Sequence, residues 1–177
     1  MRCFLGIPIP KELRKKIYET GKEIQMNGIR PVKSENLHWT VKFFGELNDE
    51  EIERVKEEMD LLDSPEGIEI EIQGFGTFPS SRVRVIWIGV GKGREKFTDF
   101  INKINKRFRG MGKDMEVIPH LTIGRVRFLK DRQKLMEKLG KMKDKEMGKM
   151  KVKELVLYES RLTPKGPVYK EVKKVMW

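Results

Sequence analysis

The chain has little cysteine and little histidine: one cysteine, Cys3, and two histidines among 177 residues. A single cysteine excludes an intramolecular disulfide, and one cysteine with two histidines cannot supply the usual ligand sets of structural zinc. No apolar run approaches the roughly 20 residues that a membrane helix needs. The apolar start, Cys3 to Ile9, lacks a signal-peptide cleavage pattern. We therefore expect a cytoplasmic protein with no membrane partner, no metal site and no disulfide.

Charged residues are abundant, and cations exceed anions. Lysine and arginine number 38 against 27 aspartates and glutamates, which gives a formal charge of +11. The many charges of both signs, with only three glutamines, resemble the composition of thermophile proteins. Thermal adaptation does not explain an excess of one sign, so the excess predicts an anionic partner such as RNA, DNA or a nucleotide. Charge does not say which of these it is.

Apolar residues recur with the spacing of short strands and amphipathic helices along the whole chain. The pattern predicts strands over 2–9, 36–44, 68–78, 83–90, 120–128, 152–159 and 168–175. It predicts helices over 11–25, from Asn48 or Asp49 to just before Ser64, over 97–108, and from Asp131 onward, with a fraying tail over 141–151. Mixed strands and helices in this order predict an α+β fold in a single catalytic domain over 1–177.

Both histidines lie in the same local sequence. The two tetrapeptides are His38-Trp39-Thr40-Val41 and His120-Leu121-Thr122-Ile123. Residues i and i+2 of a strand project from the same face, so each histidine shares a face with its threonine. The apolar second and fourth residues of each tetrapeptide are then expected to face the core.

The two copies lie 82 residues apart, close to half of the chain. An internal duplication would place two related lobes, approximately 1–80 and 81–177, about a pseudo-twofold axis, with the two His-x-Thr faces opposite each other across a central cleft. Such a site suits phosphate esters, because one neutral imidazole can act as a base while the other, protonated, acts as an acid. The threonine hydroxyls could donate to phosphate oxygens. This chemistry needs no metal and no cofactor.

The ordered set of motifs resembles the two-histidine phosphoesterase superfamily, in particular its bacterial and archaeal RNA 2′,3′-cyclic phosphodiesterases, historically called 2′-5′ RNA ligases. The further segments that carry this resemblance are 2–10, 74–79, 84–90 and 157–169. Val41 and Ile123 stand where leucine is frequent in the family, and both are conservative changes at core positions.

The resemblance implies a bilobal α+β fold of two pseudo-symmetric, intertwined lobes, each with an antiparallel-rich sheet and helices. It implies metal-independent hydrolysis of RNA 2′,3′-cyclic phosphate ends to 2′-phosphates, with a reversible 2′-5′ joining of tRNA halves. In family terms His38 donates a proton to the leaving 3′-oxygen and His120 accepts one from the attacking water. Thr40, Thr122 and Arg125 would bind the phosphate. The implied partner is RNA, as tRNA fragments or nucleotides, with no obligate protein partner.

Arg125 resembles a family arginine near the phosphate, but strict alternation from His120 points it to the opposite face. Gly124 could allow a bulge that redirects it. The alternative for Arg125 is a surface ion pair.

Other side chains near the motifs have simpler expected roles. Lys42 is in phase with the first motif and could contact the phosphate in a similar way, but a solvated lysine is the expected role. Phe43 and Phe44 are expected in the core, although one of them could stack on a base. Trp87 is also expected in the core. The basic stretch 141–153 could follow an RNA backbone, but such charge runs usually form solvated faces.

Three alternative functions stay open at this point. An RNA- or nucleotide-binding module could use the histidines only to contact phosphate, and binding without turnover would distinguish it. The same histidines could act as an RNA ligase when a 5′-hydroxyl end replaces water. A ligase with a covalent lysine intermediate has less support, because the chain has no Lys-centred nucleotidyl-transfer motif and no Gly-x-x-x-x-Gly-Lys-Ser/Thr loop.

Overall fold

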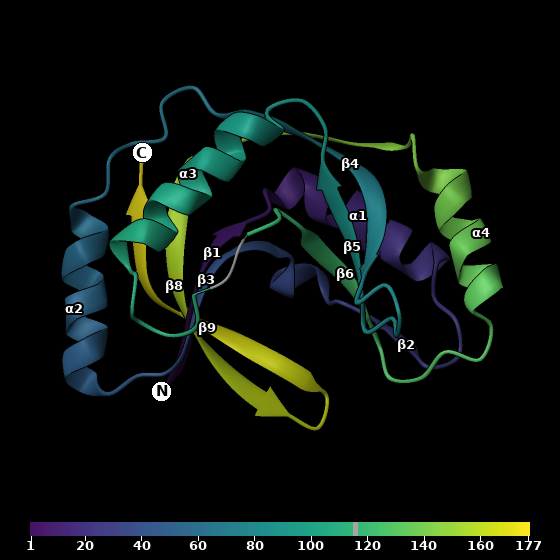
Figure 1. Ribbon diagram of the computed structural model, residues 1–177, viewed down its shortest axis with the longest axis horizontal. Coiled ribbons are helices and arrows are strands. Elements are labelled where there is room, and N and C mark those ends of the chain that lie inside the picture. Colours follow the sequence, from purple (N-terminus) through teal and green to yellow (C-terminus); the bar gives the residue numbers. More distant parts are fainter. Residues whose placement is uncertain (115–116) are drawn as a thin grey trace.

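The computed structural model describes residues 1–114 and 117–177, and these form four α-helices and nine β-strands (Figure 1). The strands are β1 Arg2–Pro8, β2 Ile29–Pro31, β3 His38–Glu46, β4 Glu69–Phe78, β5 Val85–Val90, β6 Leu121–Val126, β7 Glu146–Lys151, β8 Glu154–Thr163 and β9 Gly166–Met176. The α-helices are α1 Lys11–Glu23, α2 Asp49–Asp60, α3 Arg94–Arg107 and α4 Arg132–Met142, and a short 3₁₀ helix, η1, spans Ser34–Asn36.

The strands form a sheet in the order β7-β4-β5-β6-β3-β1-β8-β9, with β2 added beside β6. Every pairing between these strands is antiparallel. Counted outward from the junction of β3 and β6, the two halves of the sheet match strand for strand. The predicted bilobal α+β fold is therefore confirmed.

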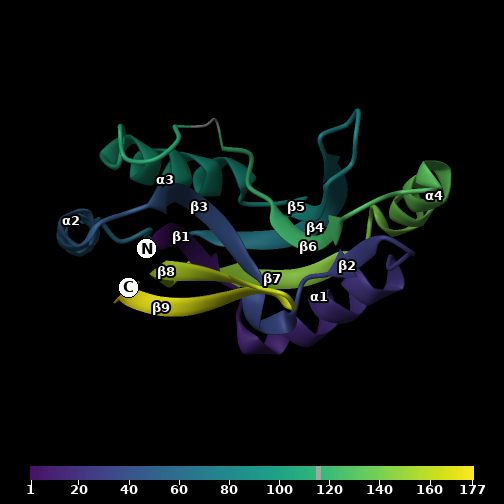
Figure 2. The ribbon, with the colours of Figure 1, turned by 90° about the horizontal axis from the view of Figure 1, so that it is seen from below.

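The two lobes are intertwined, because each borrows elements from both ends of the chain. Helix α1 follows β1 but contacts β6 and β7 of the other lobe, whereas α3 follows β5 and contacts β3. Figure 2 shows α3 above the strands and α1 below them. Strand β4 belongs with β5 and β6, and β8 and β9 belong with β1. The sheet halves are thus not the contiguous segments 1–80 and 81–177.

Local sequence explains where the helices begin and which face they bury. The side chain of Asn48 accepts a hydrogen bond from the Glu51 amide, and the Glu51 carboxylate accepts one from the Asn48 amide, which completes a capping box at the start of α2. The Asp131 side chain caps α4 in the predicted way. In α3 the predicted apolar stripe is buried, with Phe97 and Ile101 fully covered.

Two parts of the secondary structure differ from the sequence prediction. Residues 146–151 do not fray: they form β7, which buries Met147 and Met150 and pairs with β4. The short strand β2 was not predicted, because a three-residue edge strand carries no periodic pattern. None of the helices in the described ranges combines the length and the apolar composition of a membrane span.

Candidate active site

The two His-x-Thr motifs lie side by side at the junction of the two lobes. Trp39 of β3 pairs with Leu121 of β6, and both side chains are fully buried. In this antiparallel register each histidine lies next to the threonine of the other motif, on the face opposite the two buried side chains. The predicted inward direction of the apolar motif residues is confirmed for Trp39, Val41, Leu121 and Ile123.

A β-bulge follows the threonine in each motif. In β3 the register with β1 shifts between Thr40 and Lys42, so that Val41 is the extra residue. In β6 the register with β5 shifts after Thr122, and Ile123 is the extra residue. Because a bulge adds one residue to one strand only, the alternation of side chains is reversed beyond it. Both strands therefore present a different residue to the cleft than simple alternation predicts.

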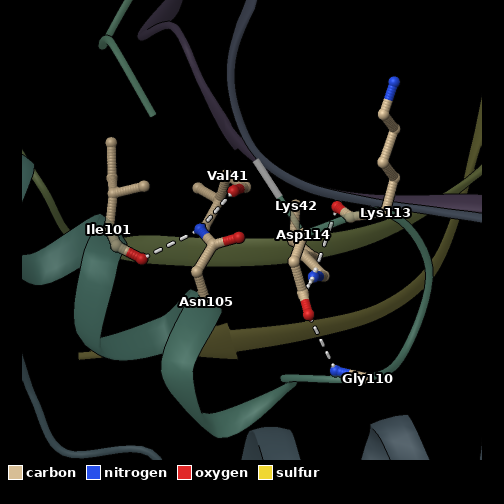
Figure 3. Close-up of polar contacts among 7 residues, drawn as sticks. All are labelled: Val41, Lys42, Ile101, Asn105, Gly110, Lys113 and Asp114. Atoms are coloured by element: carbon tan, nitrogen blue, oxygen red, sulfur yellow. Dashed lines mark hydrogen bonds and ion pairs between the residues drawn. The ribbon is translucent and has the colours of Figure 1, made fainter. Parts of the chain in front are cut away.

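Each bulge leaves a backbone carbonyl free of the strand ladder, and each carbonyl has a specific donor. The Val41 oxygen accepts a hydrogen bond from Asn105 Nδ2 at 2.7 Å, and Asn105 also donates to the Ile101 oxygen at 3.0 Å (Figure 3). The Ile123 oxygen accepts one from the Val32 amide at 2.9 Å. Satisfying these carbonyls removes the cost of an unpaired buried polar group.

The first imidazole is held by hydrogen bonds on both nitrogens. His38 Nδ1 lies 2.6 Å from the Asn36 carbonyl oxygen. A carbonyl can only accept, so Nδ1 carries the proton and Nε2 is the basic nitrogen of the neutral ring. Nε2 accepts from the Thr40 hydroxyl at 3.0 Å. Burial lowers the pKa of His38 to about 4, despite the favourable Asn36 bond, and the nearby Arg125 adds to the effect.

The second imidazole has the same tautomer. His120 Nδ1 donates to the Ile118 carbonyl at 2.8 Å, which leaves Nε2 as the basic nitrogen. Burial again lowers the pKa of His120, the bond to Ile118 opposes that change, and Arg125 lowers the pKa further. Both rings are therefore neutral near pH 7 in the unliganded protein.

Aromatic side chains support both imidazoles in matching ways. Phe4 packs against His38 with ring centroids 4.8 Å apart and stacks on Tyr158 at 5.1 Å. Phe78 meets the His120 ring edge-on at 5.2 Å. Phe78 also stacks on the indole of Trp87, with ring centroids 5.0 Å apart. Sequence reasoning did not identify these supporting rings, since a lone phenylalanine in a strand looks like any core residue.

The prediction that Trp87 lies in the core is wrong. It pairs in register with Thr122, so its ring is on the face of the histidines and contacts His120 at 6.4 Å. The ring covers Gly76, where a Cβ would overlap it. The indole nitrogen is buried without a hydrogen-bond partner among the described residues.

A cavity of about 240 Å³ opens on this face and joins the two motifs. His38, Thr122 and Arg125 line it together. The bulge at Ile123 thus brings Arg125 back to the face of the motif. A bulge near Gly124 was the condition under which the sequence allowed this direction. Thr40 and His120 are outside the lining of this cavity, and Thr40 is connected to it through the His38 ring. A larger hollow of about 900 Å³ lies between the segment 61–68, which follows α2, and helix α3, and contains no motif residue.

Lys42 is not a solvated lysine. The bulge turns it inward, where its side chain is 1% exposed, and its ammonium group pairs with the Asp114 carboxylate at 2.5 Å (Figure 3). Asp114 also accepts a hydrogen bond from the Gly110 amide at 3.2 Å. The ion pair therefore fastens the segment after α3 to the strand that carries the first motif.

The Lys42–Asp114 pair should make stability depend on acid pH. The hydrogen bond from Lys42, and then that from Gly110, lower the pKa of Asp114. The stabilisation is therefore present above the pKa of the unfolded carboxyl and is lost as pH falls through the lower folded value. Asp114→Asn is expected to lower the thermal midpoint near neutral pH, because the buried ammonium loses its counter-charge.

Melting curves of wild type and Asp114→Asn between about pH 2 and 7 check this expectation. The two midpoints should converge at the acid end. Glu53→Gln, which breaks the surface pair with Lys56, is the matched control and should change little. If the two midpoints differed as much at the lowest pH as at pH 7, the charge of the Asp114 carboxylate would not be the cause of the difference.

The two phenylalanines that follow Lys42 have different environments. Phe44 is buried, as predicted, and packs edge-on against Phe108. Phe43 is 51% exposed and lies 5.8 Å from Phe4, so the prediction of core packing is wrong for it. Counted from the bulges, Phe43 holds the position in its strand that Arg125 holds in the other.

Two imidazoles of the same tautomer lie on adjacent strands with a threonine beside each, and an arginine shares the cavity of the first imidazole. This arrangement defines a two-histidine phosphoesterase type of site. The comparisons agree with this class. The profile of the family described as LigT-like phosphoesterases matches the chain twice, over residues 7–87 and 88–169. The chain belongs to the LigT-like phosphoesterase family.

Curated relatives and solved structures are similar over almost the whole chain. A protein of Methanocaldococcus jannaschii named RNA 2′,3′-cyclic phosphodiesterase is 40% identical, over 98% of this chain and 99% of its own length. A protein of the same name from Methanothermobacter thermautotrophicus is 37% identical, over 97% and 96%. The crystal structure of Escherichia coli LigT in its apo form superposes with a TM-score of 0.79 over 99% of this chain and 96% of that one, at 22% identity. That last similarity shows the fold alone.

Proposed function

We propose that this protein hydrolyses RNA 2′,3′-cyclic phosphate ends to 2′-phosphates by acid and base catalysis, with His38 and His120 as the two catalytic groups. The observation that carries the proposal is the pair of imidazoles on adjacent strands, each with Nδ1 fixed on a backbone carbonyl. The relatives at 37% and 40% identity bear the name of this activity. An RNA substrate also fits the excess of cations and a cytoplasmic location.

The reaction requires two proton transfers: the attacking water loses one proton, and the leaving 3′-oxygen gains one. A water oxygen forms a bond to phosphorus, the bond between phosphorus and the 3′-oxygen breaks, and the 2′-oxygen keeps the phosphate. In the assignment taken from the family, His120 Nε2 accepts the water proton and His38 Nε2–H donates to the leaving 3′-oxygen. For His38 to donate near neutral pH, the bound phosphate anion must raise its pKa from about 4.

The threonines and Arg125 are proposed to hold the phosphate. The Thr40 hydroxyl already bonds His38 Nε2 at 3.0 Å, so it lies where the donated proton would move. Thr122 and Arg125 both line the cavity that His38 borders. Their hydroxyl and guanidinium protons would stabilise the charge that builds on the non-bridging oxygens.

Thr40→Val and Thr122→Val are each expected to lower kcat/KM on a cyclic phosphate end. A hydrogen bond to a charged group contributes about 1.5 to 3 kcal/mol, which corresponds to roughly 10- to 100-fold. Thr40→Ser and Thr122→Ser keep the hydroxyl and serve as matched controls that should retain most of the rate. If valine and serine variants had the same kinetics as wild type, the hydroxyls would not bind the reacting phosphate.

A joining reaction results when the 5′-hydroxyl of a second RNA end replaces water as the nucleophile. The two histidines would keep their roles, with His120 accepting the 5′-hydroxyl proton and His38 donating to the leaving 3′-oxygen, and the product would be a 2′-5′ linkage, for example between tRNA halves. The balance between hydrolysis and joining depends on whether the cleft excludes water and holds a second strand.

The experiment that tests the proposal is turnover of an RNA oligonucleotide with a 2′,3′-cyclic phosphate end, in the presence of a chelator, with 2′- and 3′-phosphate products resolved. We expect only the 2′-phosphate product. A 3′-phosphate product would reverse the assigned leaving group. Retained RNA affinity without turnover would show a binding module instead.

A further inference from the structure

The cavity beside His38 carries more positive charge than one cyclic phosphate requires. A cyclic phosphodiester has a single negative charge, which Arg125 and the two threonines can bind. Three further cations line the same cavity, Arg30, Lys33 and Lys165. We call Arg30, Lys33, Arg125 and Lys165 the cationic pocket. In the described residues, 1–114 and 117–177, no ion pair joins any of the four to a carboxylate.

Two of these cations face each other directly. Arg30 of β2 pairs with Arg125 of β6 in antiparallel register. Side chains at such positions lie on the same face with Cβ atoms about 4.5 to 5.5 Å apart, and like charges there are destabilising. An anion between the two guanidinium groups would convert this repulsion into attraction, and guanidinium groups match phosphate in geometry.

The hairpin of β8 and β9 forms the other wall of the cationic pocket and is anchored close to its tip. Asn36 Nδ2 donates to the Pro167 carbonyl at 2.9 Å, and the Tyr169 ring packs edge-on against His38 at 5.3 Å. At the tip, a Cβ on Gly166 would lie 3.9 Å from Arg30 Nη1. The hairpin, which projects from the sheet in Figure 1, therefore brings Lys165 and Gly166 close to Arg30.

We propose that the cationic pocket binds the phosphodiester that precedes the cyclic phosphate on the RNA strand. This inference rests on the proposed function and adds its substrate class: oligonucleotide ends in preference to a free nucleoside 2′,3′-cyclic phosphate. The cavity extends from His38 and Thr122 to the hairpin tip, so a strand whose last phosphate reaches the histidines passes its preceding phosphate over Arg30 and Lys165. At about 240 Å³ the cavity is smaller than the usual 300 to 1,000 Å³ of small-ligand pockets, so it suits a short part of a strand.

The test compares two substrates with the same reacting group: adenosine 2′,3′-cyclic phosphate and triadenylate ending in a 2′,3′-cyclic phosphate. Wild type is expected to show a higher kcat/KM on the trinucleotide. Arg30→Ala and Lys165→Ala should each lower kcat/KM on the trinucleotide by about 10- to 100-fold, the usual effect of losing a hydrogen bond to a charged group. The loss on the mononucleotide should be at least tenfold smaller.

Salt dependence gives a second readout. Removing one cation that neutralises a phosphate of single-stranded RNA should reduce the slope of log kcat/KM against log salt by about 0.7. Arg54→Ala is the matched control, since Arg54 is an exposed arginine on α2, away from the cavity, and it should change neither substrate's turnover.

The outcomes separate the two proposals. Equal losses on both substrates would overturn the inference, because the cationic pocket would then act only on the reacting end. No loss on either substrate would overturn it as well. Turnover of neither substrate by wild type would instead contradict the proposed function.

Discussion

His38→Ala and His120→Ala are each expected to lower kcat on an RNA 2′,3′-cyclic phosphate end by about 10² to 10⁴-fold, the usual contribution of one positioned proton transfer. Each ring has one nitrogen committed to a backbone carbonyl, so only Nε2 can exchange a proton with the substrate. No other histidine exists in the chain to replace either one. Initial rates with saturating substrate measure the effect.

The double variant His38→Ala/His120→Ala should be scarcely slower than either single variant. Catalytic groups that act as one unit show strongly non-additive losses, because removing one already disables the shared step. Thermal midpoints of all three variants separate lost chemistry from lost structure, since the His38 ring also packs against Phe4 and Tyr169. A single variant that kept a near-normal rate, or losses that simply multiplied in the double variant, would contradict paired acid and base catalysis.

The shared face of histidine and threonine in each motif could be predicted from sequence because the information is local. A strand fixes the direction of residues i and i+2 without reference to the rest of the chain. The inward direction of Trp39 and Leu121 followed from the same rule and is confirmed. The repeat of the motif then indicated the two lobes.

The side-chain directions of the residues beyond each threonine could not be predicted, because two bulges reverse the alternation of side chains between the two faces of the sheet. The bulge at Val41 depends on Asn105, 64 residues later, which bonds the freed carbonyl. The bulge at Ile123 likewise depends on the distant Val32 amide. No local pattern contains these partners. Lys42 was therefore expected in solvent and is buried.

The division of the chain between the lobes depends on strand pairing at long range. The two similar halves of the chain indicated only approximate bounds, 1–80 and 81–177, for two intertwined lobes. They did not show which strands are exchanged: β8 and β9 return to pair with β1, and β4 joins β5. Strand β7 was missed for a related reason. Its glutamate, glycine and lysines have low strand propensity. Pairing with β4 and burial of its two methionines give it order that propensity does not provide.

The activity should have an unusually acidic optimum in kcat/KM, and a less acidic one in kcat. Burial disfavours the charged imidazolium, so the pKa of His38 is about 4 and that of His120 is below its ordinary 6.5 in the free protein. The pH profile of kcat/KM reports the free enzyme. One histidine must be protonated and the other neutral, so this profile should be a bell with its maximum below pH 6.5. Above that maximum it should fall about tenfold per pH unit.

The profile of kcat reports the complex instead, and its maximum should lie at higher pH. The phosphate anion stabilises the imidazolium and offsets both burial and the repulsion from Arg125, so the pKa of each histidine rises on binding. Because the chain has only two histidines, their ring signals can be titrated by NMR and assigned with the two alanine variants. Titrations without ligand and with a 2′-nucleotide product measure the shift directly. A free-protein pKa of His38 near 6.5, or a product complex with unchanged values, would mean that the active site does not couple phosphate binding to protonation of its acid.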